Sequence, residues 1–87
     1  NYYVEARTRN NGRTDIVVDY RGKQYIIELK IYRGAEYNRK GEVQLTSYLE
    51  SYHLQKGYLV SFNFNKNKKA CIREVVCNGK TIVEVIV

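Results

Sequence analysis

Three charged residues, Asp15, Glu28 and Lys30, have the types and spacing that could hold a metal ion beside a cationic group. Glu28 and Lys30 are two residues apart in an apolar run, so their side chains leave the same face of a β-strand. Asp15 lies in the preceding run, beyond a short turn at Arg21-Gly22. Antiparallel pairing of residues whose numbers sum to 43 puts Asp15 opposite Glu28, with β-carbons roughly 4.5–5.5 Å apart and Lys30 as the diagonal neighbour.

Two carboxylates held opposite each other repel and weaken a sheet. A divalent cation between them removes that repulsion, so the pairing of Asp15 with Glu28 predicts a metal site. The expected ion is Mg²⁺, or Mn²⁺ in its place, because a hard cation takes carboxylate and water oxygens. We expect the backbone carbonyl of Leu29 to supply a third protein oxygen.

The metal-site prediction requires an even number of unpaired residues in the turn. A slip of one residue would send Glu28 and Lys30 to the opposite face from Asp15. A three-residue loop with Gly22 in a bulge is the competing arrangement. We predict the even register, with the three charged side chains on one face and near Gln44.

Beside a metal-bound phosphate, Lys30 could orient or deprotonate the attacking water, or neutralise charge that develops on the phosphate. The alternative is that Glu28 and Lys30 form an ion pair on a solvated face. The run Tyr25–Leu29 is nearly continuous in apolar residues, which is typical of a strand covered on both sides. We therefore place the two charges at the edge of a buried layer, where a site is the better interpretation.

The elements that must position these residues follow from hydrophobic periodicity and turn signals. A helix is predicted over about Lys40–Leu54, after a loop at Arg33–Arg39, with Gly57 placed to end it or to begin the next turn. Its buried face carries Leu45, Tyr48, Leu49 and Tyr52 at the spacing i, i+3, i+4 and i+7. Strands are predicted over Tyr2–Thr8, Arg13–Tyr20, Lys23–Tyr32, Tyr58–Phe64, Ala70–Cys77 and Thr81–Val87, with turns at Asn10-Asn11-Gly12 and Asn78-Gly79.

This order predicts a mixed α/β fold of one domain, residues 1–87. The first three strands are antiparallel, and the strand-helix-strand unit should make the third and fourth parallel through a right-handed crossover. The helix then covers one face of the sheet and leaves the other bare, and a missing N-terminal helix would cover that face. Because the chain begins at Asn1, we expect it to be the C-terminal part of a longer protein.

The composition is that of an ordinary globular domain, with 44% apolar and 28% charged residues among 87. No apolar run approaches the roughly 20 residues of a membrane span, and no secretion signal is present, so a cytoplasmic location is expected. Cys71 and Cys77 match no zinc signature, and with His53 as the only histidine we expect buried free thiols rather than ligands or a disulfide. A Ser–His–acid triad is poorly supported.

Fifteen Lys and Arg against nine Asp and Glu give a formal net charge of +6. A basic surface favours polyanions, and nucleic acid above all, although such charges also serve simply to solvate a surface. The candidates for phosphate contacts are Arg13, Arg33, Arg39 and Lys40.

Three motifs occur in order: Gly12-Arg13-Thr14-Asp15, Ile27-Glu28-Leu29-Lys30 and Gln44-Leu45-Thr46-Ser47-Tyr48. Together they resemble the PD-(D/E)XK nuclease superfamily, in the branch with the Q-x-x-x-Y element, from about Tyr2 to Phe64. The chain is most similar to the C-terminal nuclease domain of bacterial AAA-type ATPases. The resemblance implies a restriction-endonuclease-like fold, DNA as partner and an AAA-type ATPase region in the same chain, with a homodimer left open.

In the resembled family, the positions of Gln44 and Tyr48 lie beside the metal site and contact the substrate or the attacking group. The two residues are four apart, hence on one helix face. Alternatively Tyr48 belongs to the core and Gln44 to the surface, although a buried ring can still direct its hydroxyl to the site. Many members place a further acid on an N-terminal helix, which this sequence lacks, and Glu5 in the first strand is expected to be structural.

The sequence therefore predicts a metal-dependent nuclease domain that hydrolyses phosphodiester bonds of DNA. The alternative is an inactive nuclease-like module of an ATPase that binds nucleic acid or a partner. The missing helix favours this alternative, and the retained acid pair with its lysine argues against it.

Overall fold

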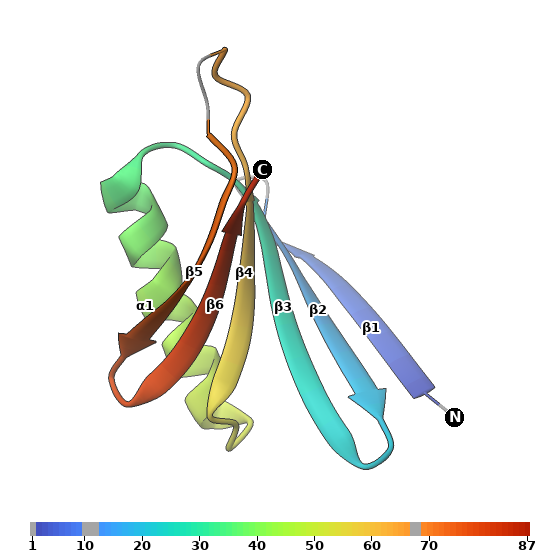
Figure 1. The fold of residues 1–87 in the computed structure, drawn as a ribbon. Coiled ribbons are helices and arrows are strands. Elements are labelled where there is room, and N and C mark those ends of the chain that lie inside the picture. Colours follow the sequence, from blue (N-terminus) through green and yellow to red (C-terminus); the bar gives the residue numbers. More distant parts are fainter. Residues whose placement is uncertain (1, 10–12, 67–68) are drawn as a thin grey trace.

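A computed structural model of the chain describes residues 2–9, 13–66 and 69–87. It consists of one six-stranded sheet with a single long helix packed on one side of it (Figure 1). The elements are β1 (Tyr2–Arg9), β2 (Arg13–Tyr20), β3 (Lys23–Ile31), α1 (Ala35–Ser51), β4 (Lys56–Phe62), β5 (Cys71–Cys77) and β6 (Lys80–Ile86).

The sheet is mixed, with the strand order β1-β2-β3-β4-β6-β5. The first three strands form an antiparallel meander, β3 pairs parallel with β4, and β4 pairs parallel with β6. The hairpin partner β5 is antiparallel to β6 and forms the far edge. The predicted mixed α/β sheet, with its third and fourth strands parallel, is confirmed. The strand ends agree with the prediction to within two residues.

Two hairpin turns have the same backbone geometry. Arg21 and Gly22 have φ of 52° and 76°, and Asn78 and Gly79 have φ of 52° and 78°. Left-handed angles at both central residues are the requirement of two-residue type I′ turns, which match the twist of the flanking strands. The predicted turn at 10–12 lies outside the described residues.

The tight turn at Arg21-Gly22 fixes the register of β2 against β3. Asp15 lies opposite Glu28, and Val17 lies opposite Ile26. The predicted even register is therefore confirmed, and the bulged three-residue alternative is wrong. Because alternate residues share a face, Asp15, Val17, Ile26 and Glu28 all point to the side of the sheet on which α1 packs.

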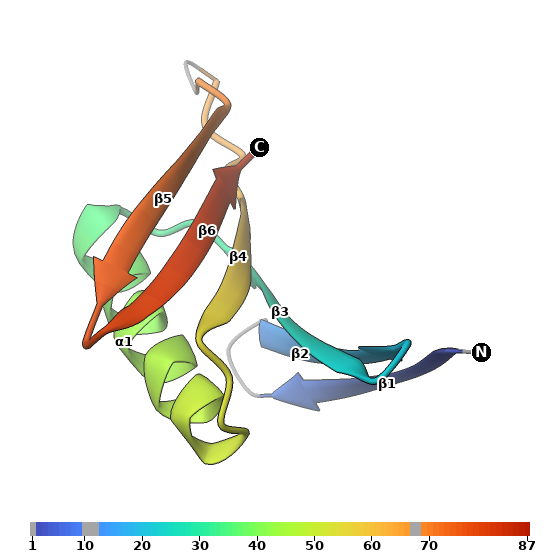
Figure 2. The same cartoon turned by 60° about the horizontal axis from the view of Figure 1, so that its bottom comes forward.

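The apolar core lies between that side of the sheet and the C-terminal half of α1. Leu45 and Leu49, on the predicted helix face, are fully buried there, with Tyr48 and Tyr52 packed partly against them. The remaining fully or nearly fully buried core side chains come from four strands: Val17, Ile26, Leu59 and Ile82. Figure 2 shows α1 lying along the β4–β6–β5 half of the sheet, while β1, β2 and most of β3 extend beyond it.

The helix α1 starts five residues before its predicted start at Lys40 and ends three residues before its predicted end at Leu54. The hydrophobic periodicity marked only the half that packs on the core, because the first turns carry polar residues. Gly34, with φ of 104°, breaks the extended chain directly before Ala35, and Glu36 suits the positive end of the helix dipole.

The C-terminal end of α1 is closed by His53 rather than by Gly57. His53 has φ of 57°; its N–H bonds to the Glu50 carbonyl at 3.1 Å, and the Leu54 N–H bonds to the Leu49 carbonyl at 2.9 Å. These two bonds form a Schellman motif with a non-glycine residue at the left-handed position. Gly57 instead lies in β4 beneath the helix.

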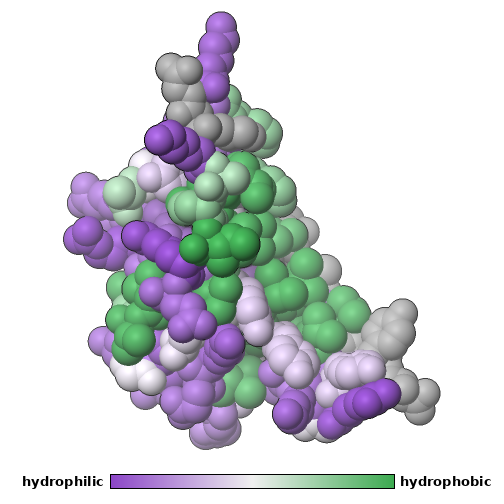
Figure 3. Space-filling view, viewed as in Figure 1, coloured by the Kyte–Doolittle hydropathy of each residue, from purple (hydrophilic) through white to green (hydrophobic). Residues whose placement is uncertain are grey.

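The opposite side of the sheet carries apolar side chains, and no helix of the described residues covers it, as predicted. Hydrophobic groups gather across the middle of this side in Figure 3. At the edge strand β5, Ile72 and Val76 are 74% and 73% exposed. Cys71, also on β5, is exposed and Cys77 is only half-buried, so the prediction of two buried thiols is wrong, although both cysteines are free.

No helix in the described part of the chain is both long enough and apolar enough to cross a membrane.

Substitution of Gly57 by alanine should destabilise the fold by about 1–3 kcal/mol through overpacking. A β-carbon at this position would lie 2.9 Å and 3.0 Å from the two methyl carbons of Leu49 and 3.3 Å from Cδ2 of Leu45. Thermal or urea unfolding measures the change. Glu50→Ala, on the exposed side of α1, is the matched control and should leave stability within about 0.5 kcal/mol. Equal stability of the two variants would contradict this packing.

Candidate active site

Two buried carboxylates face each other at the centre of the candidate site. Asp15 on β2 and Glu28 on β3 are direct partners in the antiparallel ladder, and their exposed fractions are 1% and 2%. The two side chains leave the same face of the sheet, because directly opposed residues do so. Burial of charge is unfavourable unless hydrogen bonds, opposite charges or a cation compensate it. A bound cation is one of the groups that could compensate the two buried carboxylates of this acid pair.

The acid pair opens onto a cavity of about 460 Å³ between β2, β3 and α1. A water molecule occupies about 30 Å³ in the liquid, so a hydrated cation and a phosphate group would both fit. The helix contributes the other wall, with the residues Val43, Gln44, Ser47, Tyr48 and Ser51. The structure thus brings Gln44 and Tyr48 to the acid pair, from a different element and at the predicted helical spacing.

Tyr48 belongs both to the core and to the lining of the cavity, so its packing in the core does not exclude it from the cavity. Its half-buried ring packs against the core and meets the ring of Tyr52 edge-on, with centroids 5.0 Å apart and planes at 80°. The two hydroxyls are 3.4 Å apart. Gln44 is exposed at the cavity wall, where its amide can reach a ligand.

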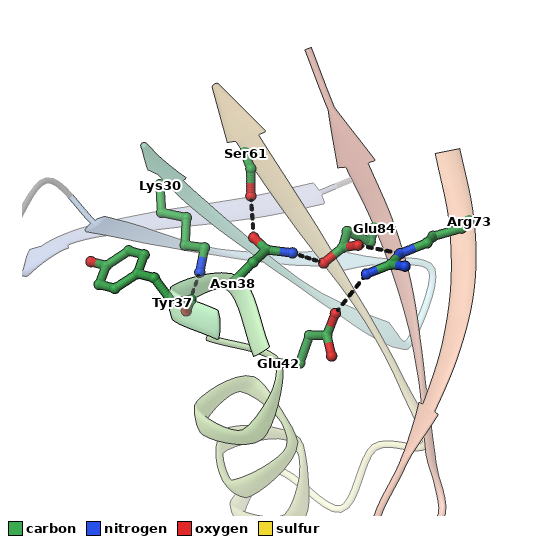
Figure 4. A network of polar contacts seen from close by, with 7 residues as sticks. All are labelled: Lys30, Tyr37, Asn38, Glu42, Ser61, Arg73 and Glu84. Carbon is green, nitrogen blue, oxygen red and sulfur yellow. Dashed lines mark hydrogen bonds and ion pairs between the residues drawn. The ribbon is translucent and has the colours of Figure 1, made fainter. Parts of the chain in front are cut away.

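Lys30 is on the same face as Glu28 but its ammonium is turned toward α1. The residue is 2% exposed, which excludes the alternative of an ion pair on a solvated face. Its Nζ donates a hydrogen bond to the Tyr37 carbonyl at 3.1 Å and lies 4.6 Å from the centre of the Tyr37 ring (Figure 4). Among the described residues, Lys30 is not one of those that line the cavity of the acid pair.

The chemistry of the donor set fits a hard divalent cation. No group of three or more His, Cys, Asp or Glu side chains suited to a metal ion exists within the described residues, so the protein offers the two carboxylates. Mg²⁺ is commonly held by one or two carboxylates, with water and substrate phosphate supplying the other oxygens. Leu29 lies between Glu28 and Lys30 on β3, and its side chain points to the opposite face.

The predicted phosphate contacts fall into three groups. Arg39 and Lys40 line a second cavity of about 420 Å³, which shares Val43 and Gln44 with the first. They therefore lie beside the approach to the acid pair. Arg33 is exposed, and its guanidinium carbon lies 5.7 Å from the centre of the Tyr37 ring. The side chain of Arg13 is outside the described part of the chain.

A second polar cluster lies under the N-terminal half of α1, and the sequence interpretation missed it. Asn38 accepts a hydrogen bond from Ser61 Oγ at 2.9 Å and donates one to Glu84 (Figure 4). Arg73 donates to Glu84 at 2.5 Å and lies 3.6 Å from Glu42. We call these five residues the polar network. Its one sequence signal is Glu84, a lone acid at an inward position of the apolar strand β6.

The charges of the polar network perturb one another. Burial, together with a hydrogen bond to Glu84 and its negative charge, raises the pKa of Glu42 to about 7, against the opposing effect of Arg73 and Lys30. The hydrogen bond with Glu84 raises the pKa of Arg73 above its ordinary value. Near pH 7, Glu42 is therefore only partly ionised.

Comparison with known proteins agrees with the fold. The family model of the PD-(D/E)XK nuclease superfamily matches residues 2–75 of this chain. The chain belongs to the PD-(D/E)XK nuclease superfamily, and its mixed sheet with one packed helix is consistent with the restriction-endonuclease-like fold. No curated protein and no solved structure matches it.

The raised pKa of Glu42 should make stability fall as the pH rises. Between its ordinary pKa of 4.5 and its folded value of about 7, the folded state binds more protons than the unfolded state. The free energy of unfolding therefore decreases across this interval and stays low above it. Glu42→Gln keeps a hydrogen-bond donor that does not titrate, so this variant should lack the decrease.

Thermal unfolding between pH 4.5 and pH 8 tests this. The Tm of the wild type should fall by several degrees relative to Glu42→Gln, whereas Glu50→Gln on the exposed side of α1 should follow the wild type. Parallel Tm curves for the wild type and Glu42→Gln would show that Glu42 titrates normally.

Proposed function

We propose that this domain is a metal-dependent nuclease that hydrolyses phosphodiester bonds of DNA. The observation that carries the proposal is the acid pair: Asp15 and Glu28, opposed and buried, at the wall of a cavity large enough for a phosphate. Opposed carboxylates repel each other and destabilise a sheet, and a bound divalent cation would remove this repulsion. Membership of a nuclease superfamily supports the same chemistry.

Asp15 and Glu28 hold Mg²⁺ or Mn²⁺ in this proposal, with the backbone carbonyl of Leu29 as a third oxygen. When bound, the cation supplies a Lewis acid that polarises the scissile phosphate and lowers the pKa of the attacking water. The protein contributes a fixed site for the cation, since both carboxylates extend from neighbouring, hydrogen-bonded strands. The buried surroundings strengthen each electrostatic interaction with the phosphate.

Lys30 lies on the same face of β3 as Glu28, with its Nζ bonded to the Tyr37 carbonyl, and in this proposal it supplies the positive charge of the site. It orients or deprotonates the attacking water, or it neutralises charge that develops on the phosphate. Gln44 and Tyr48, on the opposite wall of the cavity, contact the substrate or the attacking water through their amide and hydroxyl. Both groups can donate and accept hydrogen bonds, which suits contacts to phosphate oxygens and water.

The DNA backbone approaches along the outer side of α1 in this proposal. Arg39 and Lys40 lie on that side, next to the cavity of the acid pair, and Arg33 precedes the helix. Together with Arg13, they supply contacts to phosphates on either side of the scissile bond. The net charge of +6 favours association with a polyanion over a distance set by the ionic strength.

The assignment to a particular branch of the superfamily rests on the motif Gln44-Leu45-Thr46-Ser47-Tyr48. Its two end residues line the cavity of the acid pair, which supports placement in the Q-x-x-x-Y branch. Within that branch, we propose an AAA-type ATPase region of the same chain as the partner, in the cytoplasm. A homodimer is compatible with this proposal.

Cleavage of DNA by the full chain in the presence of Mg²⁺ tests the role of Lys30. Lys30→Ala should lose about 10²–10⁴-fold in rate, the usual contribution of a proton-transfer group. Lys23→Ala, an exposed lysine on the same strand, should cleave like the wild type. Equal rates for Lys30→Ala and the wild type would remove Lys30 from the mechanism. An inactive wild type would favour the binding module.

Metal binding gives a test that does not depend on turnover. Mn²⁺ at about ten times its Kd should stabilise the native state by about 1.4 kcal/mol and raise Tm by roughly 5–10 °C. Asp15→Asn should remove this shift. Asp19→Asn is the matched control, because Asp19 lies on the same face of β2, four residues farther along, and should keep the shift. A shift that survives in Asp15→Asn would place the ion elsewhere.

A further inference from the structure

The end of the Lys30 side chain is held by the backbone of α1. Its Nζ donates to the Tyr37 carbonyl at 3.1 Å and lies 4.6 Å from the centre of the Tyr37 ring. A buried ammonium is stable only where oxygen acceptors, opposite charges and ring faces replace its hydration. The position of the helix backbone at residue 37 therefore contributes to fixing where this charge lies relative to Glu28, two residues away on β3.

Gly41, one turn after Tyr37, is buried against the same lysine. A β-carbon at position 41 would overlap Nζ of Lys30 and lie 3.1 Å from Cε and 3.4 Å from Cδ. Glycine is unfavourable inside a helix, so a packing reason is expected for it there. The overlapping atoms are the far end of a flexible side chain. An alanine at position 41 would therefore displace the ammonium rather than the backbone.

Asn38 fixes the same helical turn to the sheet. Its Oδ1 accepts from Ser61 Oγ on β4 at 2.9 Å, and its Nδ2 donates to Glu84 on β6. Ser61 is the direct neighbour of Lys30 in the β3–β4 ladder, so the helix is anchored at the strand position next to the lysine. All three hydrogen-bonding partners are buried, with exposed fractions of at most 2%.

The orientation of the Asn38 amide is determined by its partners. Glu84, whose carboxylate is paired with the Arg73 guanidinium, accepts from the NH₂ group and leaves the amide oxygen for the Ser61 hydroxyl. Arg73 completes the arrangement, because its guanidinium neutralises Glu84 from the edge strand at 2.5 Å. The helical turn that holds Lys30 is thus tied to three strands of the sheet.

We propose that Gly41 and Asn38 are positioning residues for Lys30. Because Gly41 has no side chain, it leaves space for the Lys30 ammonium under the helix. Asn38 fixes the distance of this helical turn from the sheet, and with it the position of the Tyr37 carbonyl that accepts the hydrogen bond from Lys30. The consequence for cleavage rests on the proposed function. The contacts that position Lys30 do not depend on the proposed function, and they can be measured separately.

A double-mutant cycle in thermal stability tests the contacts that position Lys30. Gly41→Ala in the full chain should lower Tm, because the β-carbon drives Nζ from the Tyr37 carbonyl. In the Lys30→Ala background the overlap is gone, and the same substitution should raise Tm through the better helix propensity of alanine. Glu50→Ala should shift Tm equally in both backgrounds. An equal change for Gly41→Ala in both backgrounds would overturn the contact.

Kinetics of DNA cleavage with Mg²⁺ test the consequence. Gly41→Ala and Asn38→Leu should lower kcat by about 10–100-fold while KM stays within about twofold, since a displacement near 1 Å can reduce rates by this amount. A merely structural role would lower the folded fraction and leave kcat per folded molecule unchanged. Should Asn38→Leu fail to fold, Ser61→Ala removes one hydrogen bond at little change in volume and should lower kcat in the same direction.

The two tests fail in different ways. A wild-type protein without cleavage would overturn the proposed function and, with it, the consequence for kcat, while the Tm cycle would still decide the contact between Gly41 and Lys30. An active wild type with unchanged kcat in folded Gly41→Ala would overturn the positioning role alone.

Discussion

The pairing of β2 with β3 in a single register is the constraint on which the rest of the site depends. A two-residue turn with left-handed angles at Arg21 and Gly22 sets that register, and side chains alternate with a period of two. Asp15 and Glu28 consequently meet on the side of the sheet that α1 covers, and Lys30 follows on the same side. A single inserted or deleted residue at the turn would leave the strands intact and separate the acid pair.

The two halves of α1 are held on the sheet by different kinds of interaction. Its C-terminal half packs Leu45 and Leu49 on the core through ordinary apolar contacts and presents Gln44 and Tyr48 to the cavity. Its N-terminal half rests on buried polar groups instead, where hydrogen bonds have strict geometric requirements. Apolar contacts tolerate small shifts of the helix, whereas the hydrogen bonds of the polar network are lost when the helix shifts. The half that holds Lys30 is thus the half whose position is most narrowly defined.

Local chemistry made much of this predictable. The two glycine-containing turns, the strand periodicity and the apolar stripe of α1 each involve neighbours in sequence, and they were enough to place Asp15 opposite Glu28 and Gln44 near both. The start of α1 could not be found in this way, because its first turns carry no apolar stripe. Asn38 and Glu84 are 46 residues apart, so no local pattern relates them. The exposure of Cys71 follows from the edge position of β5, which depends on the strand order of the whole sheet.

The ion pair of Arg73 with Glu84 affects how the domain unfolds locally. Its side chain is 58% exposed on an edge strand, yet it neutralises Glu84, which is fully buried on the neighbouring strand. Edge strands ordinarily fray at little free-energy cost. Fraying of β5 would here withdraw the counter-charge from a buried carboxylate, which is strongly unfavourable. The edge of the sheet and the first turns of the helix should therefore open together, as one cooperative unit in hydrogen exchange, although β5 and α1 are separated by β4 in the chain.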